Sequence, residues 1–450
     1  MARQKMSLDD ALAHVVRLNE AGQLQQSLHL ARQVSSAAPK VAMVHNVHSA
    51  AAEAAGELDE AIRAARAAIE LSPGMVDAHY NLGTALRRKG DYNEAIAAFR
   101  QALKLAPGDR DVIYNLSVSL QDVSQFTQAA DGFRALVKAN PEDTEAALGL
   151  ALSLSSEDHH DEADALARSQ LQRNPADTRF WRVRFDALRR RNDVDGLARL
   201  VSEASSHLGE NDAFVALADA HVLRENKLLD AALDRLAAVT APGDYGTDYA
   251  IAHAELLGKL NDQLGNTDTA FGCFSTANQL GAAAYGGRMA ERDAFDERMQ
   301  RQSALFSRDW VNSWSEVQGL HSNEEPVLLV GFPRSGTTLL DTILMSHSKV
   351  SVLEEQPVLS PVITAARKML NDDLTGLSTL DAAQLSELQS LYLERLESFR
   401  PDGDAARILI NKMPLNMVEA GLVYRLFPKA KFLLALRHPC DCVLSCYMQQ

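Results

Sequence analysis

The first part of the chain repeats one pattern of apolar and polar positions. Between about residue 8 and about residue 285, apolar residues recur three and four positions apart, which is the spacing of an amphipathic helix. Within this stretch, prolines follow one another at intervals of 34 residues, at Pro39, Pro73, Pro107, Pro141 and Pro175. Because proline stops a helix and a unit of this length holds two helices, the pattern predicts about seven or eight stacked helix pairs.

The 34-residue unit resembles the tetratricopeptide repeat (TPR). In the unit 76–109, Leu82, Ala95 and Phe99 fall where that repeat places its packing residues. One helix pair cannot bury its apolar face alone, so we expect residues 1–285 to form a superhelix with a concave groove. The resemblance implies that this groove binds a protein or peptide, and it gives the packing residues a structural role.

The last part of the chain changes to short apolar runs. Branched apolar residues are concentrated in 326–330, 406–412 and 431–436, as in strands that are buried on both faces. Helical patterns follow these runs, which predicts an α/β domain with a parallel sheet over residues 325–450. Residues 286–324 then form a connecting helix and a linker, so the fold class of the chain is α followed by α/β.

The first apolar run leads into PRSGTTLL, a P-loop-like turn that opens a helix. Gly331 and Gly336 allow a tight turn and a close approach to an anion, and the N–H groups of the helix N-terminus would point at it. Thr337 occupies the place of the lysine that a triphosphate-binding loop needs, whereas Arg334 lies inside the loop. A guanidinium binds phosphate or sulfate bidentately without a metal. The predicted anion-binding residues are Arg334, Ser335, Gly336, Thr337 and Thr338.

This loop resembles the 5′-phosphosulfate loop of sulfotransferases, most closely that of the tyrosylprotein sulfotransferase branch. Sulfotransferases take the sulfuryl group from 3′-phosphoadenosine 5′-phosphosulfate (PAPS), and they bind its 3′-phosphate with an arginine that ends a strand and a serine eight residues later. Arg437 and Ser445 match in type and spacing. The resemblance therefore implies PAPS as co-substrate, no metal, and Arg437 with Ser445 at the 3′-phosphate.

The same resemblance points to the residues that would perform the chemistry. Glu354 and Glu355 follow Arg334 by 20 and 21 residues, where tyrosylprotein sulfotransferases carry a Glu-Glu pair whose second member is the base. Glu355 is thus the predicted base, with Glu354 as the alternative. Lys412 resembles the catalytic lysine of the family and would, with Arg334, stabilise the leaving phosphate. Pro357 stands where the family has an arginine.

Charge and composition restrict the partners of the chain. A net charge of −15 over 450 residues speaks against broad attraction to nucleic acid or to an anionic membrane. The sequence contains neither a long apolar span nor the features of a signal peptide, which predicts a cytoplasmic location. Cys440, Cys442 and Cys446 lack a matching His or Cys pair for zinc, so we expect free thiols.

Together these patterns predict an enzyme that moves the sulfuryl group of PAPS to a hydroxyl acceptor, with a tyrosine presented by the TPR groove as the candidate. Two alternatives remain open: a P-loop kinase, which Thr337 disfavours, and a non-catalytic TPR scaffold whose C-terminal domain senses a nucleotide. The sulfotransferase resemblance covers only the N-terminal half of such a domain. We therefore expect a truncated domain, and whether the chain ending at Gln450 is active stays open.

Overall fold

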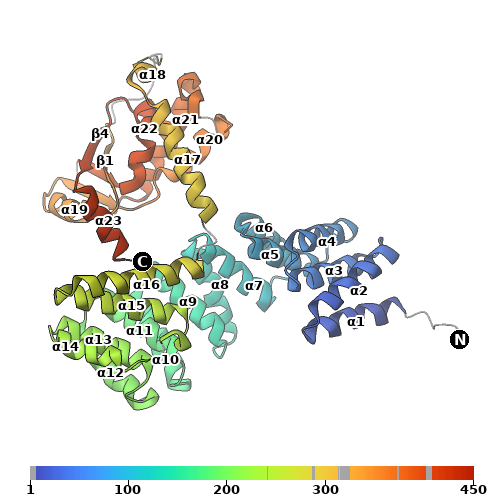
Figure 1. Ribbon diagram of the computed structural model, residues 1–450. Coiled ribbons are helices and arrows are strands. Elements are labelled where there is room, and N and C mark those ends of the chain that lie inside the picture. Colours follow the sequence, from blue (N-terminus) through green and yellow to red (C-terminus); the bar gives the residue numbers. More distant parts are fainter. Residues whose placement is uncertain are drawn as a thin grey trace. The chain divides into compact units, whose positions relative to one another are not determined.

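The computed structural model divides the chain into two compact units, Met1–Thr240 and Ala241–Gln450 (Figure 1). It describes residues 7–240, 242–285, 289–312, 314, 325–371, 374–401 and 408–449. The sequence-based boundaries after residues 285 and 324 remain predictions, and most of the expected linker lies outside the described residues.

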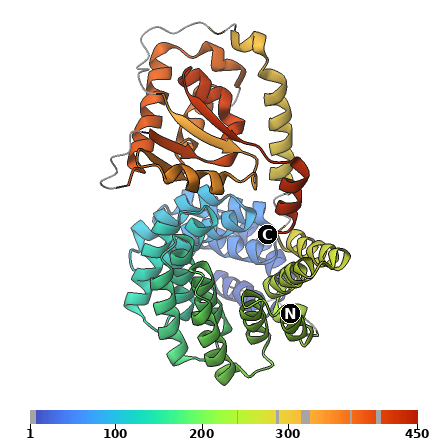
Figure 2. The same cartoon turned by 90° about the vertical axis from the view of Figure 1, so that its left-hand side faces the viewer.

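The first unit is built of paired α-helices that stack along a curved array (Figure 2). Each of the five regularly spaced prolines lies in the turn that precedes the next pair, where it ends a helix as expected. The fourteen helices described in this unit are α1 (Leu8–Glu20), α2 (Leu24–Ala37), α3 (Ala42–Ala54), α4 (Leu58–Leu71), α5 (Val76–Lys89), α6 (Tyr92–Leu105), α7 (Arg110–Asp122), α8 (Phe126–Ala139), α9 (Thr144–Ser156), α10 (His160–Arg173), α11 (Thr178–Arg190), α12 (Val194–Leu208), α13 (Ala213–Glu225) and α14 (Leu229–Ala237).

A phenylalanine seated on a glycine recurs in the repeats. A Cβ added to Gly83 on α5 would lie 2.7 Å from the ring of Phe99 on α6, and one added to Gly149 on α9 would lie 2.6 Å from Phe133 on α8. Both rings are fully buried. The absence of a side chain on one helix therefore lets the ring of a neighbouring helix fill the interface, which explains the spacing of small and large residues.

The second unit begins with a short 3-10 helix, η1 (Pro242–Tyr245), and a further helix pair, α15 (Thr247–Gln263) and α16 (Thr267–Tyr285). Helices α1 to α16 make eight pairs, so the prediction of seven or eight helix pairs is confirmed. Two more helices follow, α17 (Met289–Leu305) and α18 (Arg308–Asn312). No helix in the described part of the chain has the length and apolar character needed to cross a membrane.

The rest of the second unit is an α/β domain around a parallel four-stranded sheet in the order β2-β3-β1-β4. The strands are β1 (Val327–Gly331), β2 (Val350–Glu354), β3 (Ile408–Lys412) and β4 (Lys431–Ala435), and the helices beside them are α19 (Thr337–Met345), α20 (Ser360–Met369), α21 (Ala382–Ser398), α22 (Ala420–Leu426) and α23 (Pro439–Tyr447). Three of the four strands coincide with the predicted apolar runs. Strand β2 was not predicted, because Ser351 interrupts its apolar residues in VSVLE, whereas each predicted run holds at least three apolar residues in a row.

The register of the sheet brings the ends of its strands together. Lys412 of β3 pairs with Leu329 of β1 on one side and with Glu354 of β2 on the other. Gly331, at the end of β1, pairs with Ala435 of β4. Because all four strands are parallel, their carboxyl ends share one edge of the sheet, and the loops that carry polar side chains meet there.

Replacement of Gly83 by valine tests the repeat packing. The added side chain would overlap the ring of Phe99, so we expect Gly83→Val to destabilise the repeats by about 1–3 kcal/mol. Thermal and urea unfolding followed by circular dichroism measure the change. The control is Gly108→Val, since a Cβ at Gly108 meets no atom within 4 Å. Equal unfolding midpoints for the two variants would contradict this account of the packing.

Candidate active site

The loop between β1 and α19 has the geometry of an anion-binding turn. Gly336 adopts a left-handed conformation (φ +92°) as the N-cap of α19 and has no side chain with which to cap the helix. The first N–H groups of α19 therefore remain available to an anion. Gly331 is also required, because a Cβ there would lie 2.6 Å from Ser335 Oγ and 2.9 Å from the carbonyl oxygen of Ala435.

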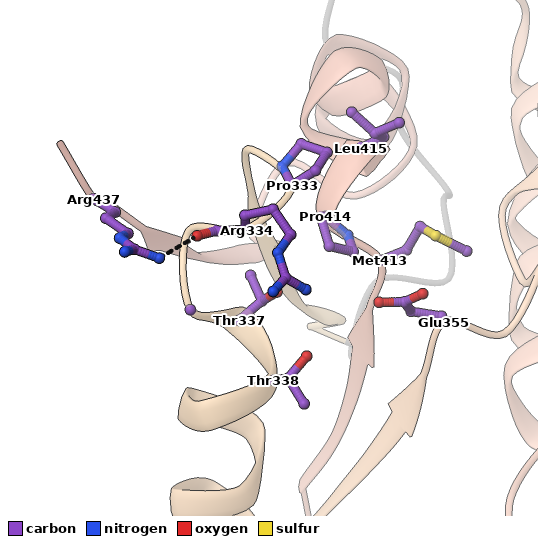
Figure 3. A pocket seen from close by; sticks show the side chains of 10 residues that line it. Pro333, Arg334, Thr337, Thr338, Glu355, Met413, Pro414, Leu415 and Arg437 are labelled. Atoms are coloured by element: carbon purple, nitrogen blue, oxygen red, sulfur yellow. Dashed lines mark hydrogen bonds between the residues drawn. The ribbon is translucent and has the colours of Figure 1, made fainter. Parts of the chain in front are cut away.

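Arg334 connects this loop to the predicted 3′-phosphate residues. It adopts a positive φ of 68°, which is uncommon for a residue other than glycine. Its Nε donates a hydrogen bond to Ser445 Oγ at 3.1 Å, and Arg437 Nη1 donates to the carbonyl oxygen of Arg334 at 3.1 Å (Figure 3). The arginine and serine that were predicted from a separate strand and helix thus lie directly against the anion loop.

Lys412 lies behind this loop, at the end of β3, with no exposed surface. Its Nζ donates hydrogen bonds to Glu355 Oε1 at 2.9 Å and to Glu354 Oε1 at 3.0 Å, and it lies 3.3 Å from Asp341 Oδ2. Burial lowers the pKa of Lys412, but the hydrogen bonds that its ammonium donates to Glu355 and Glu354 outweigh this effect and hold the pKa above its ordinary value. The lysine is therefore a charged ammonium surrounded by three carboxylates.

Glu355 is held in place by its backbone. It follows β2 with a positive φ of 51°, and its N–H donates to the carbonyl oxygen of Lys412 at 2.7 Å. The main chain turns sharply here, and the side chain, which is 56% exposed, points toward the open space beside the anion loop (Figure 3). Glu354 is similarly exposed but does not line that space.

One cavity of about 390 Å³ joins most of these groups. Figure 3 shows Arg334, Thr338 and Glu355 facing this hollow, with Met413 and Pro414 on its apolar side. The full lining is Pro333, Arg334, Gly336, Thr337, Thr338, Glu355, Met413, Pro414, Leu415 and Arg437. The cavity combines cations and free helix N–H groups for an anion with a carboxylate that can accept a proton.

The comparisons with known proteins agree with these features. Residues 326–450 match the family described as "Sulfotransferase family", and 12–75, 48–110 and 114–178 match "Tetratricopeptide repeat". Residues 326–450 form a sulfotransferase-family domain. The chain as a whole combines this sulfotransferase domain with tetratricopeptide repeats.

Individual relatives support the same assignment. The chain is 33% identical over 133 residues to protein-tyrosine sulfotransferase 2 of Gallus gallus (27% of this chain, 34% of the relative). It is 32% identical over 153 residues to protein-tyrosine sulfotransferase 1 of Homo sapiens (32% and 40%). The chain thus spans well under half the length of the curated relatives it matches. Among solved structures, the TPR protein YrrB, described as having an unusual peptide-binding site, aligns with a TM-score of 0.38 and 20% identity over 42% of this chain and 97% of its own.

The structure brings the predicted site residues of the sulfotransferase domain to one edge of its sheet. Arg334, Gly336, Thr337 and Thr338 of the anion loop line the cavity together with Arg437 and Glu355. Ser335 is buried and is not part of the lining. Ser445 and Lys412 contact residues of the lining. Sequence reasoning missed Asp341. A lone carboxylate in the apolar helix TTLLDTILM, three residues after Thr338 and so on the same helix face, was the pattern that could have indicated it.

The pH dependence of stability tests the burial of Lys412. A raised pKa means that the folded state holds the proton more tightly, so its stabilising contribution is present below the ordinary value of 10.5 and is lost as the pH rises beyond it. Removing the ammonium leaves Asp341 buried without its cation. We expect Lys412→Met to destabilise the sulfotransferase domain by about 3 kcal/mol at neutral pH, and the difference from the parent chain to shrink at strongly alkaline pH.

Urea unfolding at a series of pH values measures this difference. The control is Lys431→Met, which removes an exposed lysine that pairs with Glu325 at the surface. That variant should change the free energy of unfolding by less than about 1 kcal/mol at every pH. A Lys412→Met effect as small as the control, or one that grows with pH, would contradict the buried ammonium.

Proposed function

We propose that the sulfotransferase domain transfers the sulfuryl group of PAPS to a hydroxyl acceptor. The observation that carries this proposal is the direct contact between two anion-binding groups, the loop at Arg334 and the pair Arg437 and Ser445. PAPS carries a phosphosulfate and a phosphate on one ribose, so it needs two such groups close together. The loop would hold the 5′-phosphosulfate, and Arg437 with Ser445 would hold the 3′-phosphate.

The fit is supported by the chemistry of the residues present. The uncapped N-terminus of α19 and the Arg334 guanidinium suit a tetrahedral oxyanion. The bound co-substrate supplies an activated sulfuryl group whose bond to the 5′-phosphate oxygen breaks as the acceptor oxygen bonds to sulfur. Glu355, on the opposite wall, would take the proton of the acceptor hydroxyl, and Lys412 would neutralise the charge that develops on the 5′-phosphate.

The hydrogen bonds from Lys412 to Glu354 and Glu355 must change before this reaction can occur. Glu355 cannot serve as a base while its Oε1 accepts a hydrogen bond from the ammonium, and Lys412 is fully covered. Binding of the anionic co-substrate would compete with the glutamates for the lysine and release Glu355 toward the acceptor. The resting arrangement therefore represents a closed form of the site that an anion opens.

The acceptor and the role of the repeats form the second part of the proposal. A tyrosine of a protein or peptide is the candidate acceptor, because the matched relatives are named protein-tyrosine sulfotransferases. The repeats would bind the partner that carries this tyrosine, as a stacked helical groove is suited to do. Pro357 stands where the family has an arginine, so other residues must hold the acceptor.

Ligand preference distinguishes the proposal from its two alternatives. Titration calorimetry with adenosine 3′,5′-bisphosphate should show binding without metal that exceeds the binding of ATP with Mg²⁺. The opposite preference would favour a small-molecule kinase. Binding of the bisphosphate with no sulfate transfer from labelled PAPS to tyrosine peptides or to a protein captured on the repeats would favour the scaffold.

Arg437 provides the matching mutational test. Charged hydrogen bonds to phosphate are worth about 1.5–3 kcal/mol, so Arg437→Ala should weaken binding of adenosine 3′,5′-bisphosphate by about tenfold or more. Arg308→Ala, which removes an exposed arginine at the start of α18, serves as the control. The 3′-phosphate role of Arg437 would be refuted if adenosine 5′-phosphate lost as much affinity as the bisphosphate.

Glu355 provides a test of the base. A general base contributes about 10²-fold or more to the rate, so Glu355→Gln should lower kcat by at least that factor. Bisphosphate affinity should not fall, because the neutral amide competes less with the anion for Lys412. Glu354→Gln is the matched comparison, since this neighbour contacts the same ammonium but does not line the cavity. A larger loss of kcat in Glu354→Gln would assign the base to Glu354.

A further inference from the structure

Asp341 is a buried carboxylate that the proposed chemistry does not use. It lies on α19, four residues beyond Thr337, and only 1% of its surface is exposed. Its Oδ2 lies 3.3 Å from Lys412 Nζ, and its Oδ1 accepts a hydrogen bond from Thr342 Oγ1 at 3.3 Å. A buried carboxylate is costly unless a cation or several donors lie beside it, and Lys412 is the cation next to Asp341.

Four oxygen atoms surround the ammonium, which has only three hydrogens to donate. Glu355, Glu354 and Thr338 accept at 2.9, 3.0 and 3.5 Å. Asp341 Oδ2 lies within ion-pair distance but, with these partners in place, receives no hydrogen bond. Asp341 therefore interacts with the ammonium as an ion pair, and its Oδ2 atom near Lys412 Nζ can still accept a hydrogen bond.

The carboxylates differ in how freely they can move. Glu354 and Glu355 follow β2 and have side chains that are 54% and 56% exposed, so they can turn toward solvent or a ligand. Asp341 lies on α19 and is only 1% exposed, so its side chain is far more restricted than those of the two glutamates. Besides Glu355, the charged groups among the residues that line the adjoining cavity are the cations Arg334 and Arg437. Both would repel the ammonium.

We propose that Asp341 is a positioning residue, the fixed counter-ion that keeps Lys412 charged and directed at the anion loop when the two glutamates move away. This inference rests on the proposed function, because that function requires Glu355 to leave the lysine. As Glu355 turns to the acceptor, the ammonium hydrogen that it releases can be shared between Asp341 Oδ2 and the ligand. Without Asp341, the buried lysine would lose its charge or follow the glutamates out of the site.

The test compares Asp341→Asn with Asp341→Glu and with Glu387→Gln, a change at an exposed residue of α21. The first readout is the pKa of Lys412, which is measured by NMR of the unliganded chain with ¹³C- and ¹⁵N-labelled lysine. The signal of Lys412 is assigned by its absence in Lys412→Arg. We expect Asp341→Asn to lower the pKa of Lys412. The lowering should be greatest in a background where Glu354 and Glu355 are both glutamine, because Asp341 is then the remaining carboxylate beside the ammonium.

The second readout separates positioning from a purely structural role. Asp341→Asn should lower kcat by about tenfold or more while the KM for PAPS and the affinity for adenosine 3′,5′-bisphosphate change little. Asp341→Glu should restore part of kcat and of the lysine pKa. A merely structural residue would instead lower the unfolding temperature and change kcat, KM and affinity together.

The two proposals can fail separately. An unchanged pKa of Lys412 in Asp341→Asn, alone and with both glutamates replaced, would overturn the inference about Asp341 whatever the activity. A lowered pKa in a protein that transfers no sulfate would retain Asp341 as the counter-ion of Lys412 and overturn the proposed function. The Glu387→Gln control should change neither readout.

Discussion

The buried ammonium of Lys412 is the interaction on which the arrangement of the sulfotransferase domain depends. It lies at the end of β3, between β2 and β1, and it collects carboxylates from the end of β2 and from the inner face of α19. A lysine without exposed surface requires such partners, because an isolated buried charge is strongly unfavourable. The same cluster therefore ties the neighbouring strand and helix together and holds the chemical groups of the site within a few ångströms of each other.

The parallel sheet explains why these groups meet. Strand β1 lies between β3 and β4, so the anion loop that follows it is flanked by the lysine of one neighbour and by Arg437 after the other. Loops at the carboxyl ends of parallel strands share one edge of the sheet, which is where ligands of α/β proteins bind. Two residues with unusual backbone conformations, Arg334 and Glu355, lie at this edge. Strained backbone of this kind is found where the fold requires a particular side-chain direction.

The repeats achieve their order by a different means. Small residues, and glycine in particular, let aromatic rings from neighbouring helices fill the interfaces. The same kind of contact recurs between helices along the array. Such contacts are local in sequence, so the stability of the array is close to a sum over neighbouring helices. The chemical site is the opposite case, because Lys412 meets residues that lie far from it along the chain.

The sequence by itself determined the helix pairs, three of the four strands, the glycine-bounded loop and six of the ten residues that line the cavity. These features depend on neighbouring positions: proline spacing, small and large packing residues, and a glycine-bounded turn before a helix. Strand β2 was not foreseen because Ser351 interrupts its apolar residues, and its strand conformation follows from pairing with β3. The tertiary structure alone decided that Asp341 lies against Lys412 and that Arg334 reaches Ser445. Contacts of this kind depend on strand order and helix orientation, which no local pattern of residues specifies.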